Sequence, residues 1–328
     1  MKIAFYLPGL LLRPEILENT VYDLDATHLS RWLGLGARRE MPATWLPNVF
    51  GLDRLPTAAA RKLGAGATAS GEWICLDPVC WRVAAQGVTL DDPARLALSE
   101  EESTALLAAV APLFAEWGTL GTSAPGGWEL QLQRPLALET QPLAEAIQQP
   151  IDPRLPGGAD GPAWRRLLLE VQTLLHAHPV NLAREEAGRL TVNSLWPWGQ
   201  GALPAQCTCN YAELWSADAA LVGLCRLAGA VCHPLPARFS VPSGNLLAQI
   251  DRLAAPAREL DALAWRTALL SIEQDWLEPA LAALKRGACS SLELIGTPAS
   301  DPTAVTWTLK RSDLLRFWRK PRPLTSLK

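Results

Sequence analysis

The sequence predicts an α/β protein with a mostly parallel sheet and a smaller α+β domain inserted into it. Residues 2–7 (KIAFYL) form a short, largely apolar run that ends at Pro8-Gly9, which is typical of a buried strand. From residue 160 to 328, helical and strand patterns alternate, as in a layered α/β domain. Between these regions, short strands surround a single helix. We therefore expect a discontinuous core of residues 1–65 and 160–328, with residues 66–159 as the insert.

The composition is that of a folded globular protein. The 328 residues are 49% hydrophobic and 19% charged, which excludes a disordered chain. A net charge of −3 produces no overall field that would attract nucleic acid, so a nucleic-acid partner is not expected. The seven cysteines fit no disulfide framework, which indicates a reducing compartment and a cytoplasmic location. The longest apolar run, residues 105–115, is too short to cross a bilayer, so no membrane association is expected.

Local signals indicate the elements of the insert. Small residues between Gly64 and Gly71 are typical of a linker. Residues 72–77 and 81–85 predict two short strands, and residues 128–133 (WELQLQ) alternate apolar and polar as a half-buried strand does. Ser99 and Glu102 have the spacing of a capping box, so we expect a helix to begin there and to end near residue 117.

The second half begins with a strong helix signal. Asp160 as N-cap and Pro162 predict its start, and apolar residues then repeat at helical spacing until Pro179. Apolar runs and their breakers predict the remaining elements, which are strands at 190–196, 291–295 and 304–309 and helices at 212–228, 244–253 and 261–286.

A dense group of polar and aromatic residues lies where the helix before Pro179 leads into the next strand. Ligands of open α/β sheets sit at the carboxyl ends of strands. Arg184 is suited to a two-pronged contact with phosphate or carboxylate, and glycines let backbone N–H groups approach an anion. Alternatively, the histidine and tryptophans are core residues and the glycines form a turn. The candidate ligand-binding residues are His178, Asn181, Arg184, Trp198, Gly199, Gln200 and Gly201, with His28 nearby.

The segment HPVNLAREEAGRLTVNSLWPWGQG, residues 178–201, resembles archaeal-type, cofactor-independent phosphoglycerate mutases of the alkaline phosphatase superfamily. It is still more similar to a bacterial family called "regulatory protein, Rpf-E type". Residues 25–30 (DATHLS), 72–110, 128–133 and 271–294, and the Thr297-Pro298 turn, resemble mutase segments in the same order. The resemblance implies an alkaline-phosphatase-like layered core with an inserted domain.

The resemblance also implies a serine nucleophile between two divalent metals held by aspartate and histidine. This sequence departs from that pattern. The first strand ends in Pro8-Gly9 instead of Asp-Gly, and Leu24 stands at the position of the nucleophile. The strand before Thr297 ends in Ile295-Gly296, with no Asp-His. Residues 244–275 contain no histidine. We therefore expect no catalytic residue, no metal ligand and no cofactor.

The leading hypothesis is a catalytically inactive, phosphoglycerate mutase-like protein that binds a small anionic or phosphorylated ligand, or a protein partner, in a regulatory role. One alternative is an active mutase or phosphatase with a rearranged site, which would require a divalent metal such as Mn²⁺. Another is a structural partner in a complex. No P-loop, G-x-G-x-x-G or G-x-S-x-G motif is present.

Two further groups have alternative interpretations. Cys207, Cys209 and Cys225 with Cys232-His233 are soft zinc ligands, but their spacing fits no common zinc motif, and ordinary thiols are favoured. The basic C-terminal segment interleaves Arg with aromatic residues, as in surfaces for RNA, phosphate or an acidic partner. We favour the alternative that Leu314, Leu315, Phe317 and Trp318 dock a terminal helix whose charges face water.

Overall fold

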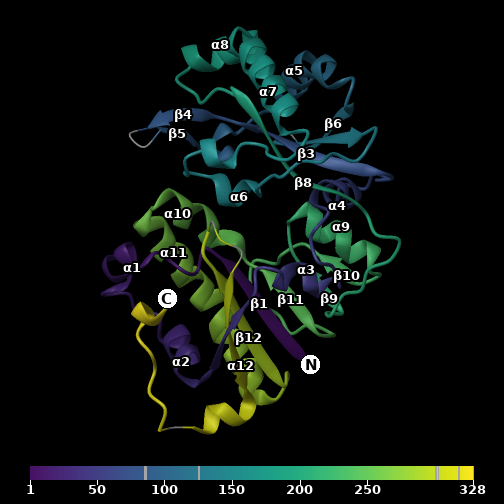
Figure 1. Ribbon diagram of the computed structural model, residues 1–328. Coiled ribbons are helices and arrows are strands. Elements are labelled where there is room, and N and C mark those ends of the chain that lie inside the picture. The colour runs from purple at the N-terminus through teal and green to yellow at the C-terminus, as the bar shows by residue number, and fades with distance from the viewer. Residues whose placement is uncertain (85–86, 125, 300, 302, 317, 328) are drawn as a thin grey trace. The chain divides into compact units, whose positions relative to one another are not determined.

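The computed structural model describes residues 1–328 except 85–86, 125, 300, 302, 317 and 328. The chain folds into two compact units (Figure 1). The first unit contains residues Met1–Arg54, Gln206–Ala217 and Cys225–Lys328, and the second contains Leu55–Ala205 and Asp218–Leu224. Each unit has its own sheet and its own hydrophobic core.

The first unit is built on a seven-stranded sheet with the order β10-β9-β11-β1-β12-β13-β2. The first five strands in this order are parallel, whereas β13 and β2 are antiparallel to their neighbours. The strands are β1 (Lys2–Pro8), β2 (Ala37–Met41), β9 (Glu213–Trp215), β10 (Val231–His233), β11 (Leu246–Gln249), β12 (Ser291–Thr297) and β13 (Ala304–Lys310).

Helices pack on this sheet through a core rich in aromatic side chains. Phe5 of β1 contacts the rings of Trp32 and Trp276 at centroid distances of 6.2 and 5.8 Å. The helical elements are α1 (Pro14–Val21), α2 (Thr27–Leu35), α3 (Trp45–Val49), α10 (Ala254–Glu259), α11 (Ala262–Ile272) and α12 (Glu278–Arg286), with a π turn at Glu273–Leu277 and 3₁₀ turns at Asp251–Leu253, Arg311–Leu315 and Leu324–Ser326. Burial of these tryptophans, rather than helix propensity, holds the layers together.

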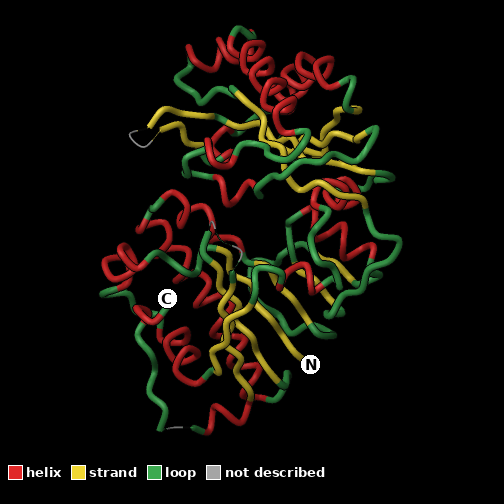
Figure 2. Tube along the Cα trace, in the orientation of Figure 1, coloured by secondary structure: helices red, strands yellow, loops and turns green. Residues whose placement is uncertain are grey.

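The second unit has a four-stranded antiparallel sheet with the order β6-β7-β3-β8, and a β4-β5 hairpin. Helices α5, α7 and α8 lie on one side of the sheet and α4 lies against the other (Figure 2). The elements are β3 (Glu72–Val79), β4 (Trp81–Ala84), β5 (Gly87–Leu90), β6 (Gly118–Ala124), β7 (Gly127–Leu132), β8 (Ser194–Ala202), α4 (Thr57–Gly64), α5 (Glu100–Val110), α6 (Leu143–Ala146), α7 (Gly161–His176) and α8 (Pro179–Glu186), with 3₁₀ turns at Pro93–Leu96, Ala111–Phe114 and Asp152–Arg154. Helix α9 (Ala219–Leu227) contributes residues to both units.

Several sequence-based expectations are confirmed. Ser99 and Glu102 form the capping box at the start of α5. Strands occur as expected at 72–77, 128–133, 291–295 and 304–309, within a residue or two. Within the described part of the chain, no helix is both long and apolar enough to span a membrane.

Other expectations are wrong in ways that have a common cause. Residues 213–215 and 246–249 are strands, although the sequence predicted helices at 212–228 and 244–253. Both are short central strands of the parallel sheet, and all of their residues but one are buried, so they lack the polar–apolar alternation that marks a strand. Asp160 does not cap α7, because its carboxylate instead accepts hydrogen bonds from Arg134 and from the backbone of Ala137.

The compact second unit also differs from the expected insert of residues 66–159. It begins at Leu55 and continues to Ala205. Strand β8 pairs with β3 over Glu72–Val79, and α7 contributes Trp164 and Val171 to the core of this unit. These contacts join segments that are far apart in the chain. The change from an α/β to an α+β pattern along the sequence therefore does not locate the boundary between the two units.

Candidate functional site

The carboxyl ends of the parallel strands define one edge of the first unit's sheet. Strands β1, β12, β11, β9 and β10 end there at Pro8, Thr297, Gln249, Trp215 and His233. Ligand sites of open α/β sheets form at this edge, because the loops that follow the strands converge there. We refer to this set of strand ends as the carboxyl edge.

The loop after β1 is closed by backbone hydrogen bonds and apolar packing. The N–H groups of Gly9 and Leu11 both donate to the carbonyl of Thr297, at 2.9 and 3.2 Å. The indole of Trp265 donates to the Gly9 carbonyl at 2.8 Å. Gly9 has a φ of +80°, and a Cβ there would lie 2.6 Å from the carbonyl oxygen of Leu253. The next residue, Leu10, is fully buried.

The neighbouring strand ends carry neutral polar groups. The hydroxyl of Ser216, just after β9, donates to the side-chain oxygen of Gln249 at 2.7 Å. Within the described residues, no group of three or more His, Cys, Asp or Glu side chains is placed to hold a metal ion. A two-metal phosphoryl-transfer centre needs such a group, so the side chains present do not fit one.

His28 and Leu24 lie in the region that resembles the mutase segment around the nucleophile. Leu24 packs as a partly buried side chain against the core. The backbone N–H and Nδ1 of His28 both contact Oε1 of Glu273, and the Nδ1 distance is 3.1 Å. The N–H of Leu29 donates to Oε2 at 3.0 Å. Glu273 thus satisfies the free N–H groups at the start of α2. Burial raises the pKa of Glu273, although these hydrogen bonds act to lower it.

The other predicted site residues all lie in the second unit, whereas His28 lies in the first. His178 is the N-cap of α8, and its Nδ1 accepts from the N–H of Val180 at 3.2 Å. The side-chain amide of Asn181 donates to the carbonyls of Leu175 and Val192 at 2.8 and 2.7 Å. Its oxygen accepts from the N–H of Val192 at 3.0 Å. These two side chains therefore hydrogen-bond to the backbone where α7, α8 and the segment before β8 meet.

Arg184 is also engaged within the fold. It is 2% exposed, and its Nε donates to the Leu190 carbonyl at 2.7 Å. Its Nη1 contacts Oε2 of Glu102 at 2.6 Å, and its Nη2 donates to the carbonyl of Leu96. Burial acts to raise the pKa of Glu102, but hydrogen bonds from Ser99 and Arg184 lower it overall. The expected role of Arg184 as a surface group that contacts an anion does not fit this burial, because all three of its nitrogens are used internally.

The glycines of the predicted site allow α4 to approach β8 closely. A Cβ at Gly199, which has a φ of +64°, would lie 2.8 Å from Cβ of Thr57. A Cβ at Gly201 would lie 3.0 Å from Cβ of Pro56. The amide of Gln200 donates to the Leu136 carbonyl at 3.1 Å. Close helix packing, rather than an open anion cradle, accounts for this glycine spacing.

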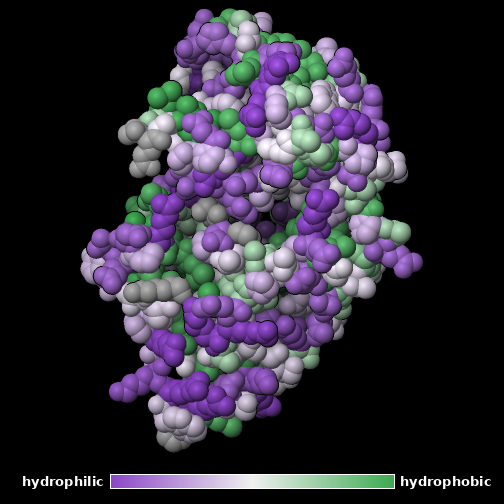
Figure 3. Space-filling model, viewed as in Figure 1, coloured by the Kyte–Doolittle hydropathy of each residue, from purple (hydrophilic) through white to green (hydrophobic). Residues whose placement is uncertain are grey.

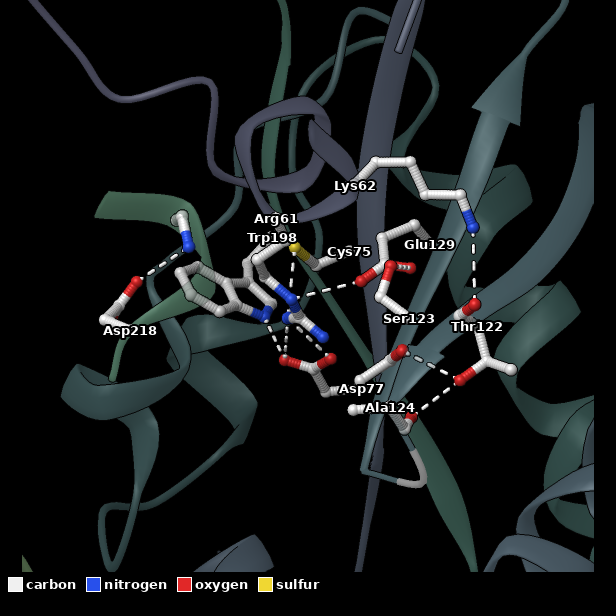
Figure 4. A network of polar contacts seen from close by, with 12 residues as sticks. Arg61, Lys62, Cys75, Asp77, Thr122, Ser123, Ala124, Glu129, Trp198 and Asp218 are labelled. Carbon is white, nitrogen blue, oxygen red and sulfur yellow. Dashed lines mark hydrogen bonds and ion pairs between the residues drawn. The ribbon is translucent and has the colours of Figure 1, made fainter. Parts of the chain in front are cut away.

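Trp198 takes part in a buried charged network that sequence reasoning missed (Figure 4). We call Arg61, Cys75, Asp77, Glu129 and Trp198 the Arg61 network. Nη1 of Arg61, on α4, lies 2.9 and 3.0 Å from the two carboxylate oxygens of Asp77 on β3. Its Nε lies 3.1 Å from Oε1 of Glu129 on β7. The indole of Trp198 donates to Asp77 at 2.7 Å, and Ser123 donates to Glu129 at 2.8 Å.

The electrostatics of this network are dominated by burial. Desolvation raises the pKa of Asp77 and of Glu129, although Arg61 acts to lower both. Burial also raises the pKa of the Cys75 thiol well above its ordinary value. The two carboxylates in turn hold the pKa of Arg61 above its ordinary range, against its own desolvation. The guanidinium of Arg61 pairs with the carboxylates of Asp77 and Glu129, and these ion pairs link α4 to the sheet. The sequence signal is weak: Asp77 and Glu129 stand within the largely apolar strands β3 and β7.

Comparison with known proteins places the fold. No family model matches the chain. Over 66 residues, the chain is 41% identical to a 2,3-bisphosphoglycerate-independent phosphoglycerate mutase of Methanosarcina mazei and 39% identical to one of Methanosarcina barkeri. The matched segment is 20% of this chain and spans only 17% of the length of each relative.

Similarity in structure extends much further. The cofactor-independent phosphoglycerate mutase of Thermoplasma acidophilum aligns with 100% of this chain and 94% of its own, with a TM-score of 0.51 and 17% identity. A Pyrococcus horikoshii protein aligns with 94% of this chain and 87% of its own, with a TM-score of 0.54 and 14% identity. The α/β fold expected from the sequence is therefore confirmed as similar to that of these solved structures, and over one short segment the sequence is similar to cofactor-independent phosphoglycerate mutases.

Proposed function

We propose that this chain is a phosphoglycerate mutase-like protein that has lost catalysis and acts as a binding or regulatory protein. The observation that carries the proposal is the chemistry of the carboxyl edge. Its strand ends carry Pro8, Thr297, Gln249, Trp215 and His233, and the described residues assemble no set of three metal ligands. A regulatory role is also that of the Rpf-E-type family that the sequence resembles.

The physical argument concerns what phosphoryl transfer requires. The metals must neutralise charge on the phosphoryl oxygens and lower the pKa of the attacking hydroxyl. Pro8 and Leu24 offer neither a ligand atom nor a nucleophile. Ser216 and Gln249 satisfy each other by a hydrogen bond, and neither bears a charge. With these side chains, the carboxyl edge supports binding and not turnover.

A groove beside the end of β12 supports the binding of a small anionic or phosphorylated ligand. It has a volume of about 600 Å³ and is lined by Arg13 and Arg38 together with the carboxylates of Glu40 and Asp301. Arg38 pairs with Glu40 at 3.0 Å, whereas Arg13 has no carboxylate partner within the described residues. An arginine with free N–H groups is sufficient to bind a phosphate or carboxylate without a metal.

The proposal is tested by metal analysis combined with a mutase assay on the purified full-length chain, with and without Mn²⁺. An archaeal cofactor-independent mutase prepared in parallel serves as the positive control. We expect no bound divalent metal and no turnover above the blank. Metal-dependent turnover that persists through repurification would instead establish an active mutase or phosphatase with a rearranged site. Co-purification with a protein but with no small ligand would indicate a structural partner.

A further inference from the structure

The C-terminal segment, residues 310–328, has contacts within itself near its start and contacts with the rest of the first unit near its end. Near its start, the carboxylate of Asp313 accepts from the backbone N–H of Lys310 at 2.9 Å and pairs with Arg316 at 3.0 Å. Near its end, Leu324 is buried and Leu327 is fully buried. The N–H of Arg322 also donates to the carbonyl of Ser30 in α2 at 2.9 Å. The described basic residues of this segment therefore lie on the surface of the first unit.

This segment brings bases from separate parts of the first unit together. Arg311 lies beside the end of α12, because a Cβ at Gly287 would come within 3.0 Å of its guanidinium. Arg319 donates to the carbonyl of Leu35 at the end of α2, at 3.3 Å. Hydrophilic residues gather over this end of the unit, around α2 and the C-terminal segment (Figures 1 and 3). We define the basic face as Arg31, Arg286, Arg311, Arg319, Lys320 and Arg322, all of which are exposed.

The charges of the basic face are not neutralised by the described residues of the chain. None of its six side chains pairs with a carboxylate in the described part of the protein, whereas Arg61, Arg184 and Arg266 each do. Residues 310–328 contain seven bases and one acid, a net charge of +6, so a chain of net charge −3 carries −9 elsewhere. A concentration of one sign on a protein of the opposite net charge creates a local field that attracts an oppositely charged partner.

Apolar side chains are exposed within this charged surface. Leu315 is 75% exposed and Trp318 is 67% exposed. The expectation that the apolar residues here dock a terminal helix is therefore wrong for these two, and Phe317 lies outside the described residues. Residues 311–315 form a single 3₁₀ turn in which Asp313 is buried and Leu315 is not. Tryptophan and arginine exposed side by side are characteristic of the energetic centres of protein interfaces.

We propose that the basic face, together with the exposed Leu315 and Trp318 of the C-terminal segment, docks an acidic, amphipathic segment of a partner protein. Acidic side chains of such a segment would pair with the unpaired arginines, and its apolar side chains would cover the leucine and the tryptophan. A single-stranded RNA would use the arginines and could stack on Trp318, but it would leave the aliphatic Leu315 without a role. The exposed leucine therefore favours protein over RNA.

The test measures fluorescence anisotropy of a labelled acidic amphipathic peptide of about 16 residues, long enough for four helical turns, titrated with the full-length protein. A peptide with the same acids but with its apolar residues replaced by Ser, and a single-stranded RNA oligonucleotide, are tested in parallel. The double variant Lys320→Glu/Arg322→Glu changes two side chains of the basic face. Its matched control, Arg54→Glu/Arg166→Glu, makes the same change in net charge at exposed residues elsewhere.

We expect saturable binding that weakens about tenfold or more in the double variant and less than about twofold in the control pair, because a charge acts mainly on a partner docked next to it. Trp318→Ala and the Ser-substituted peptide should each weaken binding severalfold. Raising the salt from about 50 to about 300 mM should also weaken it, because the Debye length falls from roughly 14 to roughly 6 Å.

Three results would overturn the proposal. These are no saturable binding at low salt, equal losses in the two charge-reversal pairs, and RNA binding that is tighter than peptide binding and competes with it. This inference goes beyond the proposed loss of catalysis. Peptide binding could fail in an inactive protein or succeed in an active mutase, so the two experiments fail independently.

Discussion

The carboxyl edge of the first unit and the Arg61 network of the second unit differ in how the fold treats polar groups. At the ends of β1, β9 and β11 on the carboxyl edge, the chain has neutral groups and a turn closed by its own backbone. In the Arg61 network, two carboxylates and a guanidinium are buried against one another. Buried charged side chains therefore need not indicate a catalytic or ligand-binding site. Here the network serves packing, whereas the ends of β1, β9 and β11 carry neutral side chains.

The largest expected effect is at Arg61. Arg61→Ala would leave Asp77 and Glu129 buried without their cation, and breaking a buried ion pair in this way costs about 3–5 kcal/mol of unfolding free energy. Denaturant unfolding followed by circular dichroism measures the loss. Arg54→Ala, at an exposed arginine, is the control and should change stability by less than about 0.5 kcal/mol. A loss below about 1 kcal/mol at Arg61 would show that the network contributes little to the fold.

A somewhat smaller effect is expected at Arg184, where packing and ligand binding predict different outcomes. Arg184→Ala removes three internal hydrogen bonds and leaves Glu102 with Arg189 alone, so we expect a loss of about 2–4 kcal/mol. Thermal unfolding measures it. Arg189→Ala is the matched control, because Arg189 contacts the same glutamate from a more exposed position, and it should cost about 0–1 kcal/mol. Unchanged stability of Arg184→Ala, together with weaker binding of an anion, would restore the role predicted from the sequence.

Gly199 tests whether the glycines of β8 serve packing. Gly199→Ala adds a Cβ 2.8 Å from that of Thr57 and also imposes a positive φ on alanine, for an expected loss of about 2–3 kcal/mol. Gly188→Ala shares a positive φ, +66°, but its Cβ would meet nothing within 4 Å, so it should cost only about 1 kcal/mol. The difference between the two variants in denaturant unfolding isolates the steric contribution. Equal losses would mean that α4 moves away from β8 without cost.

The smallest expected effect is a pH dependence arising from Glu129. Its pKa is raised in the folded state above the ordinary value of 4.5, so the folded state binds more protons than the unfolded state between these two values. Its contribution to stability is therefore present at low pH and is lost as pH rises through the folded pKa. Glu129→Gln removes this titration, so the variant should gain stability relative to the parent protein as pH rises from about 4. Unfolding titrations at several pH values measure this trend, and a difference that moves in the opposite direction would contradict the raised pKa.

Local signals in the sequence were reliable where a residue's neighbours along the chain determine its structure. The capping box of Ser99 and Glu102, the apolar strand after Met1 and the strand at 291–295 all appear as predicted. Strands β9 and β11 were missed because each has three consecutive buried residues, which show no alternation of polar and apolar side chains. The Arg61 network was missed because Arg61, Asp77 and Glu129 are far apart in the chain and meet only when α4 packs on the sheet.

By itself, the sequence determined the fold class, the strand at 2–7 and the capping box of Ser99 and Glu102, because each depends only on residue identity and order. Only the tertiary structure decided which side chains are available. It buried Arg184 against Glu102 and placed Gly199 under α4, and it left Leu315 and Trp318 exposed beside unpaired arginines. The physical reason is that burial and ion pairing depend on contacts between segments that are distant in the chain. The same residue type can therefore bind a ligand at one position and stabilise the fold at another, according to which residues pack against it.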